Sequence, residues 1–253
     1  MSDIVGNMTR RLLADAGISA GMRVLDVGCG RGDVTLMLAE LVGERGQVVG
    51  VDRDVRPLAA ARERVRALGL THITFAEGDM SALSSEYELF DAAVGRRVLM
   101  YQPEPVNAVA QLARAVRPGG LVVFQEHDST RVPVPGGQAP LPLHERVHGW
   151  MWQMVKREGA DVHMGFHLSA VLARAGLAVE QVRAEAIVQT PTQNYGIAAI
   201  VRAILPRIVE QGVATEAEID IDTLERRLLE EQQKAGVTQI WELVFGAWAR
   251  KPA

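Results

Sequence analysis

The sequence predicts an α/β fold in which a doubly wound, mostly parallel sheet of seven strands carries an inserted helical lid. Apolar segments of strand length alternate five times with segments of helical periodicity between residues 24 and 126, and the connections between them are short. The first apolar segment, Val24–Val27, leads directly into the glycine-rich turn Gly28–Gly32, and a helix begins near Asp33. In sheets of this kind a ligand lies beyond the carboxyl ends of the strands, where the strand order reverses.

Length and composition favour one globular domain over residues 1–253. The net charge of −4 disfavours a nucleic-acid-binding surface. Cys29 is the only cysteine, which excludes an intrachain disulfide and a cysteine metal cluster. The N-terminus lacks a basic-then-apolar signal, and no apolar run reaches the roughly 20 residues needed to span a bilayer. We therefore expect a cytoplasmic protein that binds neither nucleic acid nor membrane.

The glycine turn and the strand after it have the features of a nucleoside-binding site. The three glycines of the turn permit positive φ and let a ligand approach the main chain closely. The helix expected over 33–41 points its free N–H groups back at this turn. The strand expected over 47–51 ends at Asp52, which follows Gly32 by 20 residues. A carboxylate at that strand end can accept hydrogen bonds from a ribose diol.

The remaining elements complete the sheet and add the insertion. Further strands are expected over 72–76, 90–95 and 121–126, with helices over 7–16, 58–69 and 105–116. After an irregular proline-rich loop over 129–143, helices are expected over 144–158, 165–175, 197–211 and 221–235, and strands over 177–190 and 237–250. Pro57 is expected to open its helix and Pro206 to break the 197–211 helix, while Gly246 is a candidate interruption of the last strand.

The residue pattern of the turn separates two classes of nucleotide ligand. Dinucleotide sites have the pattern G-x-G-x-x-G. This turn has G-x-G-x-G, and Asp33 occupies the place of the third dinucleotide glycine. A carboxylate there would repel a pyrophosphate, so a cofactor without phosphates, especially a positively charged one, suits the turn better. The stretch Leu25–Gly32 closely resembles the first motif of class I S-adenosylmethionine-dependent methyltransferases, and the resemblance extends over about residues 21–128.

The resemblance is to the small-molecule branch of that Rossmann-like family, which includes the ubiquinone and menaquinone enzymes. It implies S-adenosyl-L-methionine as the cofactor and S-adenosyl-L-homocysteine as its product, bound by the 21–128 core. By this resemblance, Asp26 and the backbone of Gly28 and Gly30 hold the methionine end of the cofactor. Asp52 takes both ribose hydroxyls, and Arg53 flanks the adenine.

The same resemblance implies four further cofactor contacts. Asp79 accepts a hydrogen bond from the adenine amino group, and Met80 packs on the adenine ring. Gly95 and Arg96 lie beneath the methionine ammonium. Two residues have second interpretations that stay open. Asp79 can be a helix N-cap, and Asp26 can orient the glycine turn by local hydrogen bonding.

Methyl transfer from a sulfonium needs little from the protein beyond positioning the acceptor and excluding water. A base is needed only where the acceptor is a hydroxyl or a protonated amine. His127, just after the 121–126 strand, is the candidate for a catalytic base or orienting group, because of that position and the near-neutral pKa of an ordinary histidine. A structural hydrogen bond from His127 to a loop is the alternative.

Substrate contacts are expected from four side chains, which are Glu126, His148, Trp152 and Tyr195. Arg96 and Arg97 place two cations beside a cationic cofactor. One of these arginines is expected to turn away, to pair with a carboxylate such as Glu126, or to contact an acidic substrate.

The segment His144–His148 matches the zinc helix pattern H-E-x-x-H. It lies in the expected lid, away from the cofactor site, and no third ligand is evident. We therefore expect no metal site, and metal analysis of the purified protein is the test.

The expected function is transfer of a methyl group from S-adenosyl-L-methionine to a small, partly apolar acceptor, such as an intermediate of secondary metabolism. The aromatic and methionine content of the lid, over 129–166 and 191–235, favours an apolar acceptor. One alternative is a protein that binds the cofactor for a non-methylating or structural role. Another is an RNA methyltransferase, which the acidic charge balance disfavours. A homodimer is left open.

Overall fold

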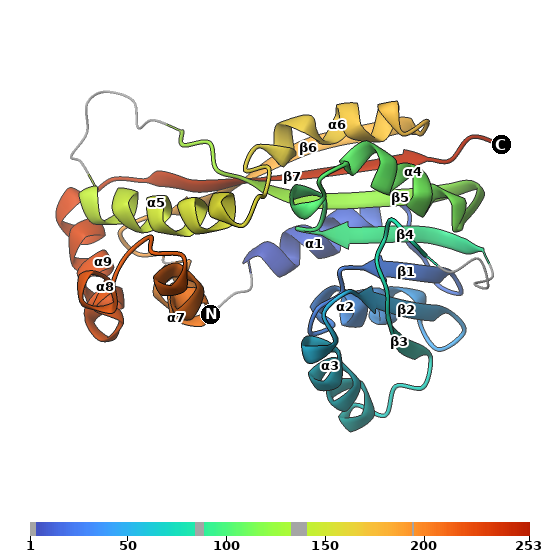
Figure 1. The fold of residues 1–253 in the computed structure, drawn as a ribbon, viewed down its shortest axis with the longest axis horizontal. Helices are drawn as coiled ribbons and strands as arrows, with labels where there is room; N and C mark the ends of the chain where they lie inside the picture. Colours follow the sequence, from blue (N-terminus) through green and yellow to red (C-terminus); the bar gives the residue numbers. More distant parts are fainter. Residues whose placement is uncertain (1–3, 84–88, 133–140, 194) are drawn as a thin grey trace.

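The computed structural model describes residues 4–83, 89–132, 141–193 and 195–253, which form one mixed sheet with flanking helices (Figure 1). The strands are β1 (Arg23–Val27), β2 (Gln47–Asp52), β3 (Ile73–Glu77), β4 (Phe90–Arg96), β5 (Val116–Asp128), β6 (Ala178–Gln189) and β7 (Gln239–Arg250). Their order in the sheet is β3-β2-β1-β4-β5-β7-β6. Neighbouring strands are parallel except at β7, which runs antiparallel to both β5 and β6. The predicted doubly wound, mostly parallel sheet of seven strands is confirmed.

Helices cover both faces of this sheet, because side chains alternate between the faces along each strand. On one face, Val24 and its neighbours pack against α1 (Ile4–Asp15), α2 (Asp33–Val42) and α3 (Val55–Ala67). On the other face, Leu25 and Val27 belong to the core that includes α4 (Pro105–Arg114) and α6 (Met164–Arg174). The strand ends between these layers are where the sequence predicts a site.

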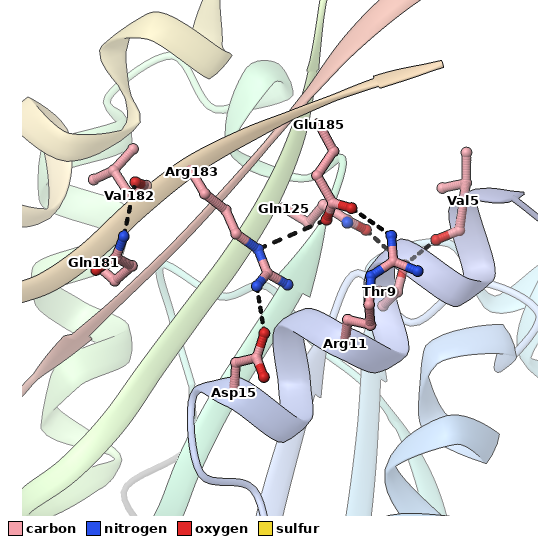
Figure 2. Close-up of polar contacts among 9 residues, drawn as sticks. All are labelled: Val5, Thr9, Arg11, Asp15, Gln125, Gln181, Val182, Arg183 and Glu185. Atoms are coloured by element: carbon pink, nitrogen blue, oxygen red, sulfur yellow. Dashed lines mark hydrogen bonds and ion pairs between the residues drawn. The ribbon is translucent and has the colours of Figure 1, made fainter. Parts of the chain in front are cut away.

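The N-terminal helix α1 is tied to the edge strand β6 by ion pairs (Figure 2). Arg11 pairs with Glu185, and Arg183 pairs with Asp15. These side chains are partly exposed, so the pairs orient the helix more than they stabilise it.

Buried contacts fix the same helix to the middle of the sheet. The hydroxyl of Thr9 donates to Oε1 of Gln125, near the end of β5, over 2.6 Å. A Cβ at Gly246 of β7 would lie 2.7 Å from Cδ1 of Leu12, so the glycine lets α1 approach the strand. The strand continues through Gly246, which corrects the expected interruption.

A group of helices lies beyond one end of the sheet (Figure 1), and it consists of α5 (Pro142–Arg157), α7 (Ile197–Glu210), α8 (Glu216–Ile219) and α9 (Ile221–Ala235). We call this group the helical unit. It corresponds to the expected insertions over 129–166 and 191–235, and its action as a lid stays a prediction. Part of the expected proline-rich loop, 133–140, lies outside the described residues. No helix in the described ranges combines the length and apolarity needed to cross a membrane.

Two prolines occupy helix positions that differ from the prediction. Pro206 lies inside α7 and does not end it. An interior proline removes one backbone hydrogen bond, but Val201 and Ile208 on either side are fully buried and hold the helix in place. Pro57 does not open α3, because the helix begins earlier, where the side chain of Asp54 accepts a hydrogen bond from a first-turn N–H.

Candidate active site at the strand ends

The glycine-rich turn after β1 adopts the left-handed backbone that its glycines permit. The φ angle is +66° at Gly28, +52° at Gly30 and +81° at Gly32. The N–H of Gly28 donates to the carbonyl of Val51 in β2 over 2.8 Å. A Cβ at Gly28 would lie only 2.3 Å from Cγ2 of Val98. Glycine is therefore required at position 28 by both its backbone angle and its neighbour.

Asp52, at the carboxyl end of β2, holds the turn from the adjacent strand. Its Oδ2 accepts from the N–H of Gly30 over 2.8 Å, and its Oδ1 accepts from the N–H of Asp54 over 2.9 Å. Each carboxylate oxygen can accept a further hydrogen bond, so both remain able to receive the hydroxyls of a ribose. Asp52 borders a cavity of about 180 Å³, which we call the strand-end cavity. Its other walls include Gly28, Arg53, Asp79, Met80, Arg97, Val98 and Tyr101.

Asp79 and Met80 lie together on one wall of the strand-end cavity. Oδ1 of Asp79 accepts from the N–H and from the hydroxyl of Ser81, over 2.8 and 2.7 Å. These hydrogen bonds lower the pKa of Asp79. Neither of them uses Oδ2, so an adenine contact is compatible with them. No helix begins at Asp79 in the described residues, so these hydrogen bonds hold a turn and not the helix N-cap considered from the sequence. Met80 is buried and supplies an apolar surface, and the contact of either residue with adenine stays a prediction.

Asp26 lies beneath the turn, where it is 1% exposed. The hydroxyl of Thr35 in α2 donates to its Oδ2 over 2.5 Å. Burial raises the pKa of Asp26 to about 7, although the Thr35 hydrogen bond and the charge of Arg96 act in the opposite direction. The carboxyl group thus joins β1 to α2, and its role in orienting the turn stays a prediction. Its contact with the methionine end of a cofactor stays a prediction.

Gly95 and Arg96 end strand β4 beside the turn. Gly95 is opposite Val27 in the sheet, and a Cβ there would lie 2.5 Å from Cε1 of Phe124. Arg96 is directed to α1, since its Nη1 lies 3.3 Å from the hydroxyl of Thr9. The backbone at this position is therefore close to the turn, while the Arg96 side chain serves the N-terminal helix.

Arg97 has a left-handed backbone that the end of β5 imposes. Its φ is +57°, which costs about 1 kcal/mol or more for a residue other than glycine. The Arg97 N–H donates to the carbonyl of Gln125 over 2.9 Å. Oε1 of Glu126 accepts from the next two N–H groups, those of Val98 and Leu99, over 3.0 and 2.8 Å.

Glu126 thus has a structural role through Oε1, while its Oε2 has no hydrogen-bond partner among the described residues, and its contact with a substrate stays a prediction. Its side chain is fully buried beneath the loop after β4. Burial raises the pKa of Glu126 to about 7, although the hydrogen bonds from Leu99 and Val98 lower it. Through these hydrogen bonds, the carboxyl group of Glu126 fixes the backbone that directly follows Arg97.

Arg97 borders three adjoining cavities. The first is the strand-end cavity. The second, which we call the helix-side cavity, has a volume of about 220 Å³ and is bordered by residues of the strand ends and the helical unit, among them Tyr101, His127, Met151, Trp152, Tyr195 and Glu242. The third, the α1 groove, has a volume of about 700 Å³ and is bordered by Val5, Arg10, Arg96, His127 and Tyr195, among others. In the described parts of the chain, the Arg97 guanidinium makes no hydrogen bond or ion pair.

The candidate substrate residues of the helical unit have different positions. Trp152 and Tyr195 border the helix-side cavity, and their contact with the acceptor stays a prediction. His148 is buried, and its ring centroid lies 5.2 Å from that of Trp241 in an edge-on arrangement. Burial lowers the pKa of His148 to about 4. His148 therefore packs within the helical unit, and its contact with a substrate stays a prediction.

His127 is paired with an acidic residue that the sequence analysis missed. Its Nδ1 lies 2.7 Å from Oε2 of Glu242 in β7, and both side chains are buried. Nε2 of His127 has no hydrogen-bond partner among the described residues. Burial lowers the pKa of His127 below its ordinary value, despite the hydrogen bond to Glu242, which acts in the opposite direction. The available signal was a lone acid within the apolar segment expected over 237–250.

The histidines of the H-E-x-x-H segment serve the packing of the helical unit. Nδ1 of His144 lies 2.7 Å from Oε2 of Glu231 in α9, while His148 packs on Trp241. Within the described ranges, no three or more His, Cys, Asp or Glu side chains are grouped in a way that could hold a metal ion.

The donor set of the strand-end cavity fits a ribose-bearing cofactor without phosphates. Asp52 and Asp79 offer carboxylate oxygens, and Met80 offers an apolar surface. Asp33 stands in the first turn of α2, where its carboxylate pairs with Arg64 over 2.7 Å. A phosphate at that helix N-terminus would meet this negative charge.

A family model for the methyltransferase domain matches residues 18–182. The chain belongs to this family. The matched span begins before β1 and reaches into β6, so it includes the glycine turn and the strand ends described above. It confirms the resemblance to class I S-adenosylmethionine-dependent methyltransferases.

Curated relatives of this methyltransferase-domain protein match over slightly less than half of its length. The demethylmenaquinone methyltransferase of Shouchella clausii is 37% identical over 117 residues, which are 46% of this chain and 50% of the relative. That of Staphylococcus aureus strain MRSA252 is 32% identical over 125 residues, which are 49% of this chain and 51% of the relative. The chain spans about half the length of the curated relatives it matches.

Solved structures with the same fold cover nearly the whole chain. A SAM-dependent methyltransferase from Aquifex aeolicus has a TM-score of 0.57 at 18% identity, over 96% of this chain and 89% of its own. Geranyl diphosphate methyltransferase in complex with GPP and sinefungin has a TM-score of 0.59 at 18% identity, over 97% and 78%. The [4+2]-cyclase SpnF has a TM-score of 0.60 at 20% identity, over 98% and 82%. At these identities the likeness supports the fold alone.

Proposed function

We propose that this protein transfers a methyl group from S-adenosyl-L-methionine to a small, partly apolar acceptor. One observation carries the proposal. The strand-end cavity, whose donors suit the ribose and adenine of the cofactor, and the helix-side cavity, with its aromatic walls, share Arg97 and Tyr101. A donor in the first cavity and an acceptor in the second would therefore meet at these shared residues.

The cofactor would be held by residues of the strand ends. Asp52 would bind the ribose, Asp79 and Met80 the adenine, and the glycine turn the methionine end, with Arg53 at the adenine side. The cofactor supplies an activated methyl group on a neutral leaving sulfur, so the protein's own contribution is orientation of the acceptor and exclusion of water.

The acceptor would lie in the helix-side cavity under the helical unit, which we propose acts as its lid. Trp152, Met151 and Met154 border this cavity and supply apolar contact, while Tyr195 and His127 supply polar groups. The match to demethylmenaquinone methyltransferases, over about half of their length, supports an acceptor with a substantial apolar part. A cytoplasmic location, a homodimer and the absence of nucleic-acid partners stay predictions from the sequence.

A second candidate function is cofactor binding without methyl transfer. The fold is shared with the [4+2]-cyclase SpnF, whose name describes a reaction other than methyl transfer. It would use the same strand-end cavity, so cofactor binding alone cannot separate the two functions.

Calorimetry and product analysis test the proposal together. We expect dialysed protein to bind S-adenosyl-L-homocysteine and not NAD, and Asp52→Ala to weaken the binding at least tenfold. Release of S-adenosyl-L-homocysteine in the presence of small aromatic acceptors would support methyl transfer. Binding without any such release across a broad acceptor panel would favour the second candidate, and binding of NAD alone would contradict both.

A further inference from the structure

The acceptor's chemical class follows from the groups that surround the buried end of the helix-side cavity, if the proposed methyl transfer holds. We propose that the acceptor atom is the oxygen of a weakly acidic hydroxyl, such as a phenol or an enol. His127 takes its proton, Glu242 positions the His127 ring, and Arg97 receives the negative oxygen. Glu242 is thereby a positioning residue contributed by a strand 115 residues away from His127.

The pairing of His127 with Glu242 fixes which ring nitrogen is available as a base. Burial alone would raise the pKa of Glu242, but the hydrogen bond and attraction from His127 lower it, with Arg97 acting in the same direction. An ionised carboxylate can only accept a hydrogen bond, so Nδ1 of His127, 2.7 Å away, must be the donor. In a neutral imidazole, Nε2 then carries the lone pair.

That lone pair has no partner elsewhere in the described chain, and His127 borders both the helix-side cavity and the α1 groove. A buried nitrogen acceptor without a hydrogen bond is costly, by about 1–3 kcal/mol. A hydroxyl placed in the cavity would supply the missing donor. Binding of a substrate of this class therefore removes the free-energy penalty of the unpaired Nε2.

The charges around His127 favour an acceptor that becomes anionic. Glu242 from β7 raises the pKa of the ring, while Arg97 and Arg96 from the end of β4 lower it. His148 of α5 acts on Glu242 but packs against Trp241. Of these groups, Arg97 alone borders the helix-side cavity as a cation without its own ion pair among the described residues. A protonated amine would be repelled by this arginine and by the positive sulfonium, whereas an oxyanion is attracted.

The proton and electron balance of this step is simple. The O–H bond breaks as Nε2 takes the proton, a lone pair on oxygen forms the new O–CH3 bond, and the S–CH3 bond breaks with its electrons left on sulfur. The imidazolium, stabilised by Glu242, then returns its proton to solvent after product release. No oxidant, reductant or further co-reactant is needed.

Three acceptors with one ring skeleton test the class. We expect the wild-type protein to methylate 2-naphthol and to leave 2-(aminomethyl)naphthalene, whose amine is protonated at neutral pH, and 2-naphthalenethiol unchanged or at least tenfold slower. If no member is turned over, 2-naphthol should still bind to the complex with S-adenosyl-L-homocysteine as its phenolate, seen as a shift in its absorption spectrum. Preference for the amine or the thiol, or binding of 2-naphthol only in its neutral form, would overturn the proposal.

Two variants test the positioning role of Glu242 against a matched pair elsewhere. Glu242→Gln keeps the shape but removes the charge, and we expect kcat to fall about 10–100-fold, with the acidic limb of the pH profile moved to lower pH. Glu231→Gln makes the same change in a second carboxylate–imidazole pair. In that pair Oε2 of Glu231 lies 2.7 Å from Nδ1 of His144, in the helical unit and outside the cavity. This substitution should lower the melting temperature while the pH profile stays unchanged. Equal pH profiles for wild type and Glu242→Gln would overturn the assignment.

Nitrogen-15 NMR of histidine-labelled protein gives a reading that needs no acceptor. We expect His127 at pH 7 to be neutral with the proton on Nδ1, and Nε2 protonation would overturn the proposal. Calorimetry with S-adenosyl-L-homocysteine on the same samples distinguishes failure of this inference from failure of the proposed function. If His127 is not protonated on Nδ1 but the protein still binds the cofactor and transfers methyl groups, only this inference is wrong. If the protein does not bind the cofactor, the proposed function is wrong.

Discussion

Three neighbouring carboxyl groups at the strand ends act differently because their burial differs. Asp26 and Glu126 are fully buried, and burial raises the pKa of each to about 7. Asp26 accepts a hydrogen bond from Thr35 in α2, and Glu126 accepts from two N–H groups of the loop after β4. Asp52 is partly exposed and borders the strand-end cavity. The residue type is nearly the same in each case, so the sequence alone assigned a ligand contact to all three.

The raised pKa of Asp26 makes the folded state lose stability as the pH rises. The pKa of this carboxyl group is 3.8, its ordinary value, in the unfolded chain and about 7 in the folded chain. Between these values the folded state binds more protons, so the free energy of unfolding falls with rising pH and stays low above pH 7. Asp26→Asn keeps an acceptor for Thr35, and it should shrink the loss between pH 5 and pH 8 by up to about 3 kcal/mol.

Urea denaturation at four pH values from 5 to 8 measures this effect. Asp79→Asn is the control, because the pKa of Asp79 is lowered and its ionisation contributes stability only above the unfolded pKa. Its contribution is already complete at pH 5, so the slope from pH 5 to 8 should equal that of the wild type. An Asp26→Asn slope equal to that of wild type would contradict the prediction.

Gly28 is the position where a single methyl group should separate cofactor binding from general stability. Gly28→Ala combines a positive φ with a Cβ placed 2.3 Å from Val98, so the loop that borders the strand-end cavity must move. We expect at least a tenfold weaker binding of S-adenosyl-L-homocysteine by calorimetry.

The control for this substitution is Gly43→Ala at the end of α2. Its φ of +64° is similar, but its Cβ meets nothing within 4 Å and it lies outside the cavity. It should cost about 1–2 kcal/mol of stability without changing the affinity. Similar losses of affinity in both variants would show that backbone strain, and not the contact with Val98, is responsible.

The end of strand β5 organises the elements around it. Gln125 binds α1 through Thr9, Glu126 holds the loop after β4, and His127 binds β7 through Glu242. Each of these partners is distant in sequence, so the strand's role depends on the sheet order β4-β5-β7.

The alternating strands and helices up to β5 could be predicted because their signals are local. Apolar periodicity and the glycine turn give β1, α2 and β2 within about a residue of their ends. Pro206 and Gly246 were misjudged because the packing of α7 and α1 outweighs the local preference of a proline or glycine. Glu242 was missed because strand register places it beside His127, and register between distant strands is not a local property.

Gly246 allows a test of how closely α1 approaches the sheet. Gly246→Ala places a Cβ 2.7 Å from Cδ1 of the buried Leu12, so the helix must shift. We expect a loss of about 1–3 kcal/mol in the free energy of unfolding. Gly149→Ala in α5 is the control, since nothing lies within 4 Å of its Cβ and alanine favours a helix by about 0.5–1 kcal/mol. Equal effects of the two alanines would contradict this packing.

At the scale of the whole molecule, the two halves of the candidate site have different origins. The strand-end cavity is built largely from residues that follow β1, β2, β3 and β4 at short distances, so a sequence motif locates it. The helix-side cavity needs the helical unit to pack against the ends of β5 and β7. Candidate acceptor residues such as His148 and Trp152 share one helix, and only packing decides that one faces the core and the other the cavity.

Two tryptophans of α5 distinguish acceptor binding from packing of the helical unit. Both tryptophans belong to the hydrophobic core and are less than a tenth exposed, but Trp152 also borders the helix-side cavity. Trp152→Phe removes ring area from the cavity wall, so we expect the KM for the methylated acceptor to rise about tenfold, which corresponds to roughly 1.4 kcal/mol. Cofactor affinity should stay constant, because Trp152 does not border the strand-end cavity.

Trp150→Phe makes the same chemical change two positions away and should have the opposite pattern. It leaves a space in the core, so the free energy of unfolding should fall by about 1–3 kcal/mol while the KM is unchanged. Steady-state kinetics and urea denaturation on both variants give the comparison. A rise in KM for Trp150→Phe as large as that for Trp152→Phe would mean that the helical unit shapes the acceptor site through its overall packing, and the helix-side cavity would lose its assignment as the place where the acceptor binds.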